Sequence, residues 1–129
     1  MMLTNAITFN PKITEIFVNG LPENTSPLKV HCQSKDDDLG VRTLKVDEKF
    51  DFSFHQNFWG TTHFYCAFAW GLKNNLFDVF YSQKSPCRFP FFKEDIYCTW
   101  LAKDVGIYFA RTNNPNPSPS DFRFVYPWL

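Results

Sequence analysis

Residues 57–70 read N-F-W-G-T-T-H-F-Y-C-A-F-A-W, and this stretch decides the fold class. It opens with a turn signal, because Asn57 and Gly60 bracket an aromatic pair. From His63 onward the side chains alternate strictly, and one face of the segment collects Phe64, Cys66, Phe68 and Trp70. This period of two is typical of a β-strand with one face in a core. The cysteine at the centre of that face is placed to form a bridge across the core.

Eight short segments share this alternation and predict strands. They are Ile13–Asn19, Leu28–Ser34, Val41–Val46, Phe50–Phe54, His63–Trp70, Leu76–Tyr81, Tyr97–Ala102 and Ile107–Ala110. Turn residues separate them, sustained helical periodicity is absent, and nine prolines interrupt the chain. The sequence therefore predicts an all-β protein, a small antiparallel β-sandwich of about eight strands.

Length and composition limit the class of protein to which this chain can belong. A chain of 129 residues has the length of one domain. Aromatic residues make up 19% of it and 16 are Phe, so we expect a core built from rings. The 13 basic and 13 acidic side chains cancel, which argues against a nucleic-acid partner. No apolar run approaches the ~18 residues of a membrane span, so we expect no membrane insertion.

The C-terminal segment differs in composition from the rest. We expect residues 1–110 to form the sandwich and residues 111–129 to form a proline-rich tail. This tail is too apolar for a purely solvated segment, because it carries Phe122, Phe124, Val125, Tyr126, Trp128 and Leu129. We expect it to fold back onto the sandwich; the alternative is that it presents a sticky surface.

Several motifs recur in order along the chain. They are V-H-C-x-S-K-D-D-D-L-G from Val30, F-S-F from Phe52, N-x-W-G-T-T-x-F-x-C-x-F-x-W from Asn57, F-D-V-F from Phe77, and C-x-W…D-x-G-I-Y from Cys98. Through them, the chain from about Ile16 to Tyr108 resembles the plant self-incompatibility family, the S-protein homologues named after the secreted stigma proteins of poppy. The resemblance implies a secreted β-sandwich. The tail departs from the family pattern, and the N-terminus does not read as a signal peptide, so we expect a mature form whose signal has been removed.

Three of the four cysteines fall on predicted core faces, and two disulfides are expected to pin the sandwich. Four cysteines allow three pairings, and we expect Cys32–Cys98 and Cys66–Cys87. A zinc site would need close C-x₂-C spacing, which the sequence lacks, so we expect no metal and no cofactor.

The acidic run and the histidines raise two further kinds of site. Asp36–Asp38 lacks the alternating pattern of a calcium loop, and we expect these carboxylates to cap a turn. His31, His55 and His63 could serve as acid and base in RNA cleavage. Nothing local supplies an orienting carboxylate or a phosphate-binding lysine, so we expect ordinary surface histidines, no catalytic residue, and a nuclease as the weakest hypothesis.

Two features favour an extracellular binding role. The turn at Trp59, together with Tyr65 or Trp128, could stack on a sugar, so a carbohydrate-binding module is an alternative function. Asn24-Thr25-Ser26 is a sequon, which makes Asn24 a candidate glycosylation site.

The function that the resemblance implies is a non-enzymatic signalling ligand. We expect a monomer that binds a plant cell-surface receptor protein, as in self-incompatibility, through the loops Leu21–Pro27, Asp47–Lys49, Gly71–Asn75 and Ser82–Asp95 and through the tail. The candidate contact residues in these loops are Lys73, Asn74, Lys84, Arg88, Lys93 and Glu94.

Overall fold

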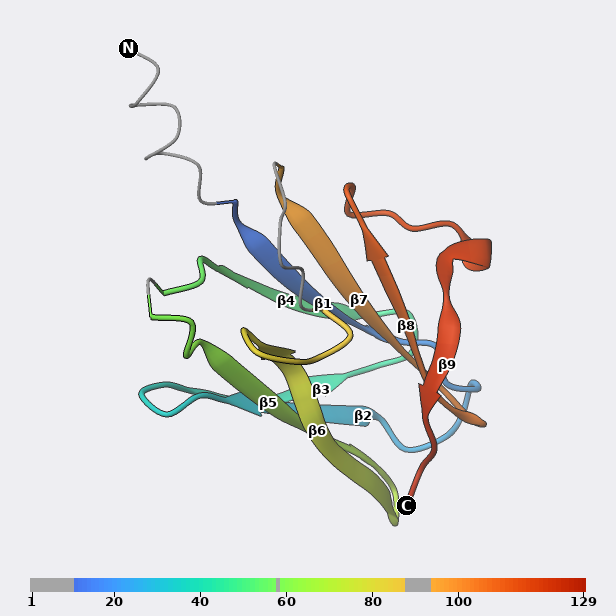
Figure 1. Cartoon of the computed structure of the whole chain (residues 1–129). Coiled ribbons are helices and arrows are strands. Elements are labelled where there is room, and N and C mark those ends of the chain that lie inside the picture. The colour runs from blue at the N-terminus through green and yellow to red at the C-terminus, as the bar shows by residue number, and fades with distance from the viewer. Residues whose placement is uncertain (1–10, 58, 88–93) are drawn as a thin grey trace.

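A computed structural model describes residues 11–57, 59–87 and 94–129 and shows two stacked sheets (Figure 1). The elements are β1 (Ile13–Asn19), β2 (Leu28–Gln33), β3 (Asp38–Leu44), β4 (Lys49–Phe54), β5 (His63–Trp70), β6 (Lys73–Tyr81), β7 (Ile96–Lys103), β8 (Gly106–Thr112), the 3₁₀ turn η1 (Pro119–Asp121) and β9 (Arg123–Tyr126). One sheet has the order β4-β1-β7-β8-β9 and the other β3-β2-β5-β6. The predicted all-β sandwich is confirmed. Within the described residues, no helix has the length and apolar character needed to cross a membrane.

Strand pairing follows the predicted antiparallel pattern with one exception. β1 and β7 run parallel, with Ile13 opposite Ile96 and Asn19 opposite Ala102. The two strands are far apart in the chain and enter the first sheet from separate connections. β1 also pairs with β4, and β7 with β8, so both are central strands. Central position explains why nearly every residue of β1 is buried.

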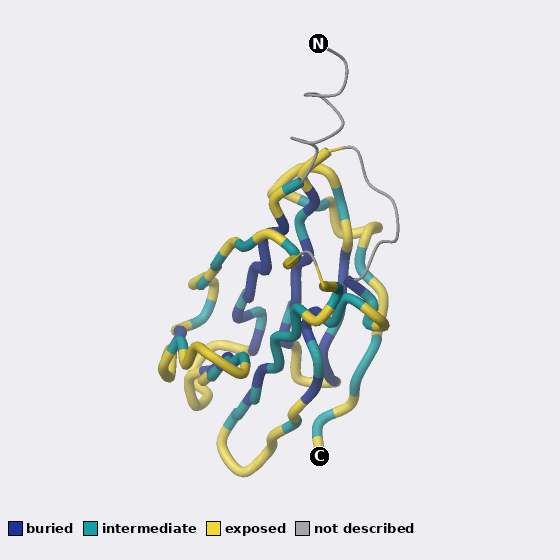
Figure 2. The backbone as a smooth tube through the Cα atoms, turned by 60° about the vertical axis from the view of Figure 1, so that its left-hand side comes forward, coloured by how far each residue is buried: buried dark blue, intermediate teal, exposed yellow. Residues whose placement is uncertain are grey.

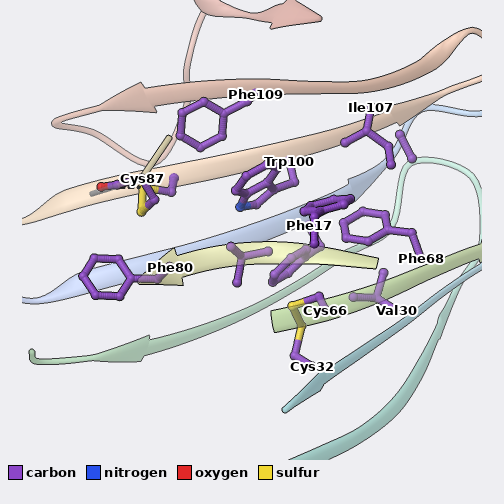
Figure 3. Close-up of a cluster of buried hydrophobic side chains, with 14 of the residues drawn as sticks. Phe17, Val30, Cys32, Cys66, Phe68, Phe80, Cys87, Trp100, Ile107 and Phe109 are labelled. Atoms are coloured by element: carbon purple, nitrogen blue, oxygen red, sulfur yellow. Dashed lines mark hydrogen bonds between the residues drawn. A yellow bond between two sulfur atoms is a disulfide. The ribbon is translucent and has the colours of Figure 1, made fainter. Parts of the chain in front are cut away.

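The core lies between the sheets and is made of rings, as the composition predicts (Figure 3). Phe68 of β5 is fully buried, and its ring centroid lies 5.8 Å from that of Phe17 and 5.0 Å from that of Phe77. Trp100 of β7 contacts Phe109 with ring centroids 4.5 Å apart. Figure 2 shows the consequence, since burial is concentrated in the middle of the strands and exposure in the loops.

The C-terminal residues join both sheets. β9 pairs with β8, so this segment extends the first sheet, and the boundary expected at residue 110 falls inside β8. Beyond β9, the backbone of Leu129 exchanges two hydrogen bonds, of 2.8 and 3.2 Å, with Asn74 of β6 in the second sheet. Between these points, the ring of Tyr126 lies 4.2 Å from that of Phe77. A side chain at Gly106 would approach Phe124 to 2.4 Å, so this glycine permits β9 to pack closely on β8.

The disulfides correct the predicted pairing. Cys32 bonds Cys66, and Cys87 bonds Cys98. The first pair joins residues directly opposite each other on the neighbouring strands β2 and β5, so it lies within one sheet and does not cross the core. The second ties the β6–β7 connection to β7. The expected Cys32–Cys98 and Cys66–Cys87 pairs are therefore wrong, because strand neighbourhood, which core-facing parity does not reveal, decides which cysteines meet.

Candidate functional site

The sandwich has two ends, and each gathers its own loops. One end, called the groove end, carries the described parts of the connections 34–37, 55–62 and 82–95, and the connection 113–122 starts there. The opposite end, called the C-terminal end, carries residues 20–27, 45–48, 71–72, 104–105 and 127–129. In Figure 1 the chain terminus lies beside the tip of the β5–β6 hairpin at this second end.

The six predicted contact residues do not form one surface. Lys73 and Asn74 lie at the C-terminal end, whereas Lys84 and Glu94 lie at the groove end, where both are exposed. Arg88 and Lys93 lie outside the described residues. Three of the predicted contact loops lie at the C-terminal end, where Asn24 is also exposed in its turn with a φ of 63°.

The C-terminal end presents large apolar side chains to solvent. Leu72, at the tip of the β5–β6 hairpin, is 100% exposed, Leu129 is 72% exposed and Val105 is 61% exposed. These three residues are called the C-terminal patch. Hydrogen bonds hold the end of the chain between the two hairpins that carry Leu72 and Val105. The backbone of Leu129 pairs with Asn74, two residues after Leu72, and Trp128 Nε1 donates to the carbonyl oxygen of Lys103, two residues before Val105, at 2.8 Å.

The aromatic residues behind the patch keep it in place. The ring of Trp128 lies 5.7 Å from that of Trp70 on β5. Lys73, on the adjacent strand β6, places its Nζ 5.8 Å from the Trp70 ring. Trp70 Nε1 donates to Thr25 Oγ1 at 3.3 Å, which connects the β1–β2 loop to the same cluster. Trp128 thus serves the fold here, and the sugar-stacking role considered for it is not supported by its position.

The groove end contains an open groove of about 750 Å³. Its walls come from residues 34–36 of the β2–β3 loop, from described residues between 54 and 65, and from Tyr81 at the end of β6. The two loops that form it, 34–37 and 55–62, are not among the predicted contact loops. The sequence analysis considered Tyr65 and the turn at Trp59 for sugar stacking but did not predict a groove. The walls come from three strands, β4, β5 and β6, and from two loops, and only the tertiary structure shows that they meet.

Two of the three histidines contact carboxylates that the sequence did not predict. His63 Nε2 lies 2.6 Å from Asp78 Oδ1, and His31 Nε2 lies 2.7 Å from Asp38 Oδ1. His55 and His63 both line the groove, as does Lys35. The expectation considered only carboxylates close in the sequence, and it did not foresee that the neighbouring strand supplies one to each histidine across a β-sheet pairing.

One carboxylate of the acidic run, that of Asp38, accepts a turn amide as predicted. Asp37 contributes through its backbone instead, since its N–H donates to Ser34 Oγ at 3.1 Å. Asp38 Oδ1 accepts the backbone N–H of Gly40 at 2.9 Å as well as the contact from His31. These hydrogen bonds, first that from Gly40 and then that from His31, lower the pKa of the Asp38 carboxyl.

Candidate metal ligands converge at one point in the described part of the chain, at Glu15, Cys87 and Cys98. The two sulfur atoms are bonded to each other and supply no thiolate, so this group is not a metal site while the disulfide is intact.

Glu15 is a fully buried acid on the core face of β1. Its Oε1 accepts a hydrogen bond from Trp100 Nε1 at 2.7 Å, and its Oε2 lies 3.0 Å from Cys87 Sγ. Cys87 Sγ is bonded to Cys98 and carries no proton, so the second contact is a hydrogen bond when the carboxyl itself donates. Burial raises the pKa of Glu15 well above its ordinary value of 4.5, although the hydrogen bond from Trp100 opposes this shift. Geometry and burial thus favour a neutral Glu15.

Replacing Glu15 with glutamine should flatten the dependence of stability on pH. The pKa of Glu15 is higher in the folded protein than in the unfolded chain. The stability that Glu15 contributes is therefore fully present below its pKa in the unfolded chain, and it is lost as pH rises toward its pKa in the folded protein. Each pH unit between the two pKa values is worth about 1.4 kcal/mol. Glutamine can donate to sulfur and accept from Trp100 at any pH, so Glu15→Gln should unfold at higher denaturant than the wild type at pH 8 and converge with it near pH 4. Parallel loss of stability in both proteins would contradict a neutral buried carboxyl, because every other titratable group is the same in the two proteins.

Comparisons with known proteins agree on one family. The family model described as plant self-incompatibility protein S1 matches residues 16–128. S-protein homolog 21 of Arabidopsis thaliana is 40% identical over 95 residues, covering 74% of this chain and 70% of that protein. Self-incompatibility protein S1 of Papaver rhoeas is 34% identical over 106 residues, covering 82% and 73%. The match to residue 128 corrects the expectation that the tail departs from the family pattern.

A solved structure shares the fold. It comes from work on self-incompatibility protein homologues, described as a widespread family of small, highly stable, secreted plant proteins. The two structures superpose with a TM-score of 0.62 at 19% sequence identity, covering 92% of this chain and 96% of the other.

Proposed function

The chain belongs to the plant self-incompatibility protein S1 family of small secreted proteins, and from this premise we propose that it is a non-enzymatic ligand for a receptor protein on the plant cell surface. The proposal concerns the binding role and the surface that performs it. Recognition would use a rigid sandwich that presents its loops, as immunoglobulin-like scaffolds do.

The observation that carries the proposal is the C-terminal patch. Leu72 is fully exposed at a hairpin tip and contributes no burial to the core. Leu129 and Val105 are exposed at the same end of the sandwich, where the backbone of Leu129 pairs with Asn74 and Trp128 donates to the carbonyl oxygen of Lys103. Exposed apolar side chains gathered at one end of a protein are typical of interaction sites, whose centres exclude charge.

The rim of the patch is polar and firmly positioned. Lys73 and Asn74 follow Leu72, and the backbone of Asn74, on the edge strand β6, pairs with Leu129. A preorganised loop loses less conformational entropy when it binds than a loose one. Lys84 and Glu94 lie at the other end and stay a prediction for a separate contact, as do Arg88 and Lys93, which lie outside the described residues. Glycosylation at Asn24 also stays a prediction.

Replacing Leu72 with glutamate should lower binding to the receptor-bearing cell surface at least ~10-fold, because a charge would be desolvated at the centre of the contact. The melting temperature should stay within about 3 °C, since surface changes rarely exceed about 0.5 kcal/mol. Binding of labelled protein to plant cells by flow cytometry and unfolding by circular dichroism measure the two quantities.

Val41→Glu is the matched control for this experiment. Val41 is also a largely exposed apolar residue, but it lies on β3 and not at the C-terminal end. It should leave cell-surface binding unchanged. If Leu72→Glu bound cells as well as Val41→Glu and the wild type did, the C-terminal patch would not be the receptor contact. Cross-linking of wild-type protein on the same cells then identifies the captured receptor.

A further inference from the structure

We infer that the groove at the opposite end of the sandwich is a binding site for an uncharged oligosaccharide. The inference does not depend on the proposed receptor role, because it rests on a different surface and on different residues. The groove volume of about 750 Å³ falls within the range of roughly 300–1,000 Å³ that is typical of ligand sites. It would accommodate several sugar rings along an open cleft.

The charges of the groove point to a neutral ligand. Among the described residues that line it, Lys35 is offset by Asp36, and His63 is paired with Asp78 directly beside the wall. A phosphate or nucleic-acid ligand requires a surplus of cationic side chains to offset its charge. The groove has no such surplus in its described walls, so an anionic polymer is a poor match.

The hydroxyl groups and rings of the groove suit a sugar. Thr61, Thr62, Tyr65 and Tyr81 contribute hydroxyls, which can donate to and accept from sugar hydroxyl groups. The ring of His63 lies 4.5 Å from that of Tyr81 and 5.7 Å from that of Tyr65, so three adjacent rings form an aromatic wall. A purely apolar ligand would remove the two tyrosine hydroxyls from water without offering them a partner, which is costly.

Asp78 fixes the tautomer of the His63 imidazole. The 2.6 Å contact between His63 Nε2 and Asp78 Oδ1 places the proton of neutral imidazole on Nε2, where it is donated to the carboxylate. Nδ1 then remains as a hydrogen-bond acceptor. In that tautomer the ring can accept a hydrogen bond from a sugar hydroxyl.

The groove is also held in shape before any ligand binds. In the β4–β5 loop, the backbone N–H of Asn57 donates to Thr62 Oγ1 at 2.6 Å, and the Asn57 side chain exchanges hydrogen bonds with Thr61. The N–H of Ser82 donates to the Thr62 carbonyl oxygen at 3.0 Å, which fixes this loop to the end of β6. Trp59 lies in the same loop and is 80% exposed.

The test begins with the purified wild-type protein on an array of neutral plant oligosaccharides, including β-1,4-linked glucans, mannans and galactans. Isothermal titration then measures affinity for the best of them. Tyr65→Ala should weaken that affinity at least ~10-fold, and Tyr65→Phe should weaken it less, because the ring remains. Tyr108→Ala is the matched control, since Tyr108 is a partly exposed tyrosine on β8 of the other sheet, and it should bind like the wild type. Circular dichroism checks that each variant is folded.

Three outcomes would overturn the inference. The first is the absence of binding to every neutral oligosaccharide on the array. The second is binding that Tyr65→Ala and Tyr108→Ala change equally, which would place the sugar elsewhere. The third is preferential, salt-sensitive binding of an eight-residue uridine oligonucleotide that is lost in His63→Ala, which would assign the groove to RNA. Leu72→Glu should bind the oligosaccharide normally, so failure here and failure of the receptor proposal are distinguishable.

Discussion

Replacing Phe68 with alanine should lower the free energy of unfolding by about 3–5 kcal/mol, the range for removal of a buried phenylalanine. Phe68 has no exposed surface and lies at the point where the two sheets meet. Its ring contacts Phe17 from the first sheet and Phe77 from the second. Alanine would therefore leave a cavity lined by rings of both sheets, which the rigid strands could fill only in part.

Urea unfolding monitored by tryptophan fluorescence measures this effect. Val41→Ala is the control, because it removes an exposed apolar side chain from a strand of the same sheet and should change stability by less than about 0.5 kcal/mol. A loss below about 1 kcal/mol in Phe68→Ala would mean that the ring is not part of a close-packed core.

The sequence predicts the strands because alternation is a local property. The face of β5 that holds Cys66 and Phe68 can be read directly from residues 63–70, and the structure buries both side chains. β9 could not be read in the same way. It follows a proline-rich segment and has only four residues, too few for a clear period, although its apolar composition indicates that it folds back.

Which strands pair with each other depends on the whole fold, and most of the contacts that the sequence did not predict depend on this pairing. β2 pairs with β5, its neighbour in space but not in sequence, and this pairing brings Cys32 to Cys66. The contact between His63 and Asp78 likewise depends on the pairing of β5 with β6, including an irregularity in register after Phe64. Neither contact follows from residue spacing alone.

The same distinction between local and tertiary features applies to the candidate sites. Lys73 and Asn74 could be predicted as exposed because they flank a glycine turn, and Gly71 does adopt a φ of +59°. The apolar patch beside them depends on the return of the chain at Leu129 to β6, which only the tertiary structure reveals. Loop composition predicts which residues are accessible, but the topology decides which accessible residues share one surface.

Removing the Cys32–Cys66 disulfide should lower stability by about 4 kcal/mol, and removing Cys87–Cys98 should lower it by about 3 kcal/mol. The first bond spans 34 residues and the second spans 11, and the chain-entropy model assigns the larger loss to the longer loop. The double variants Cys32→Ala/Cys66→Ala and Cys87→Ala/Cys98→Ala provide the comparison, by urea unfolding at pH 5. Peptide mapping of the wild type under non-reducing conditions should show the same two pairs.

The buried Glu15 gives a second reason why removing the Cys87–Cys98 disulfide could lower stability, and it could make this loss the larger of the two. Removing Cys87 takes away the sulfur that accepts a hydrogen bond from the buried carboxyl, and a buried polar group left without a partner costs about 1–3 kcal/mol. If this contact matters more than loop length, the Cys87/Cys98 variant would lose more stability than the Cys32/Cys66 variant. Adding Glu15→Leu to both variants separates the two causes, because it removes the carboxyl. The loop-length account requires the original order to hold in that background, and a reversed order there would contradict it.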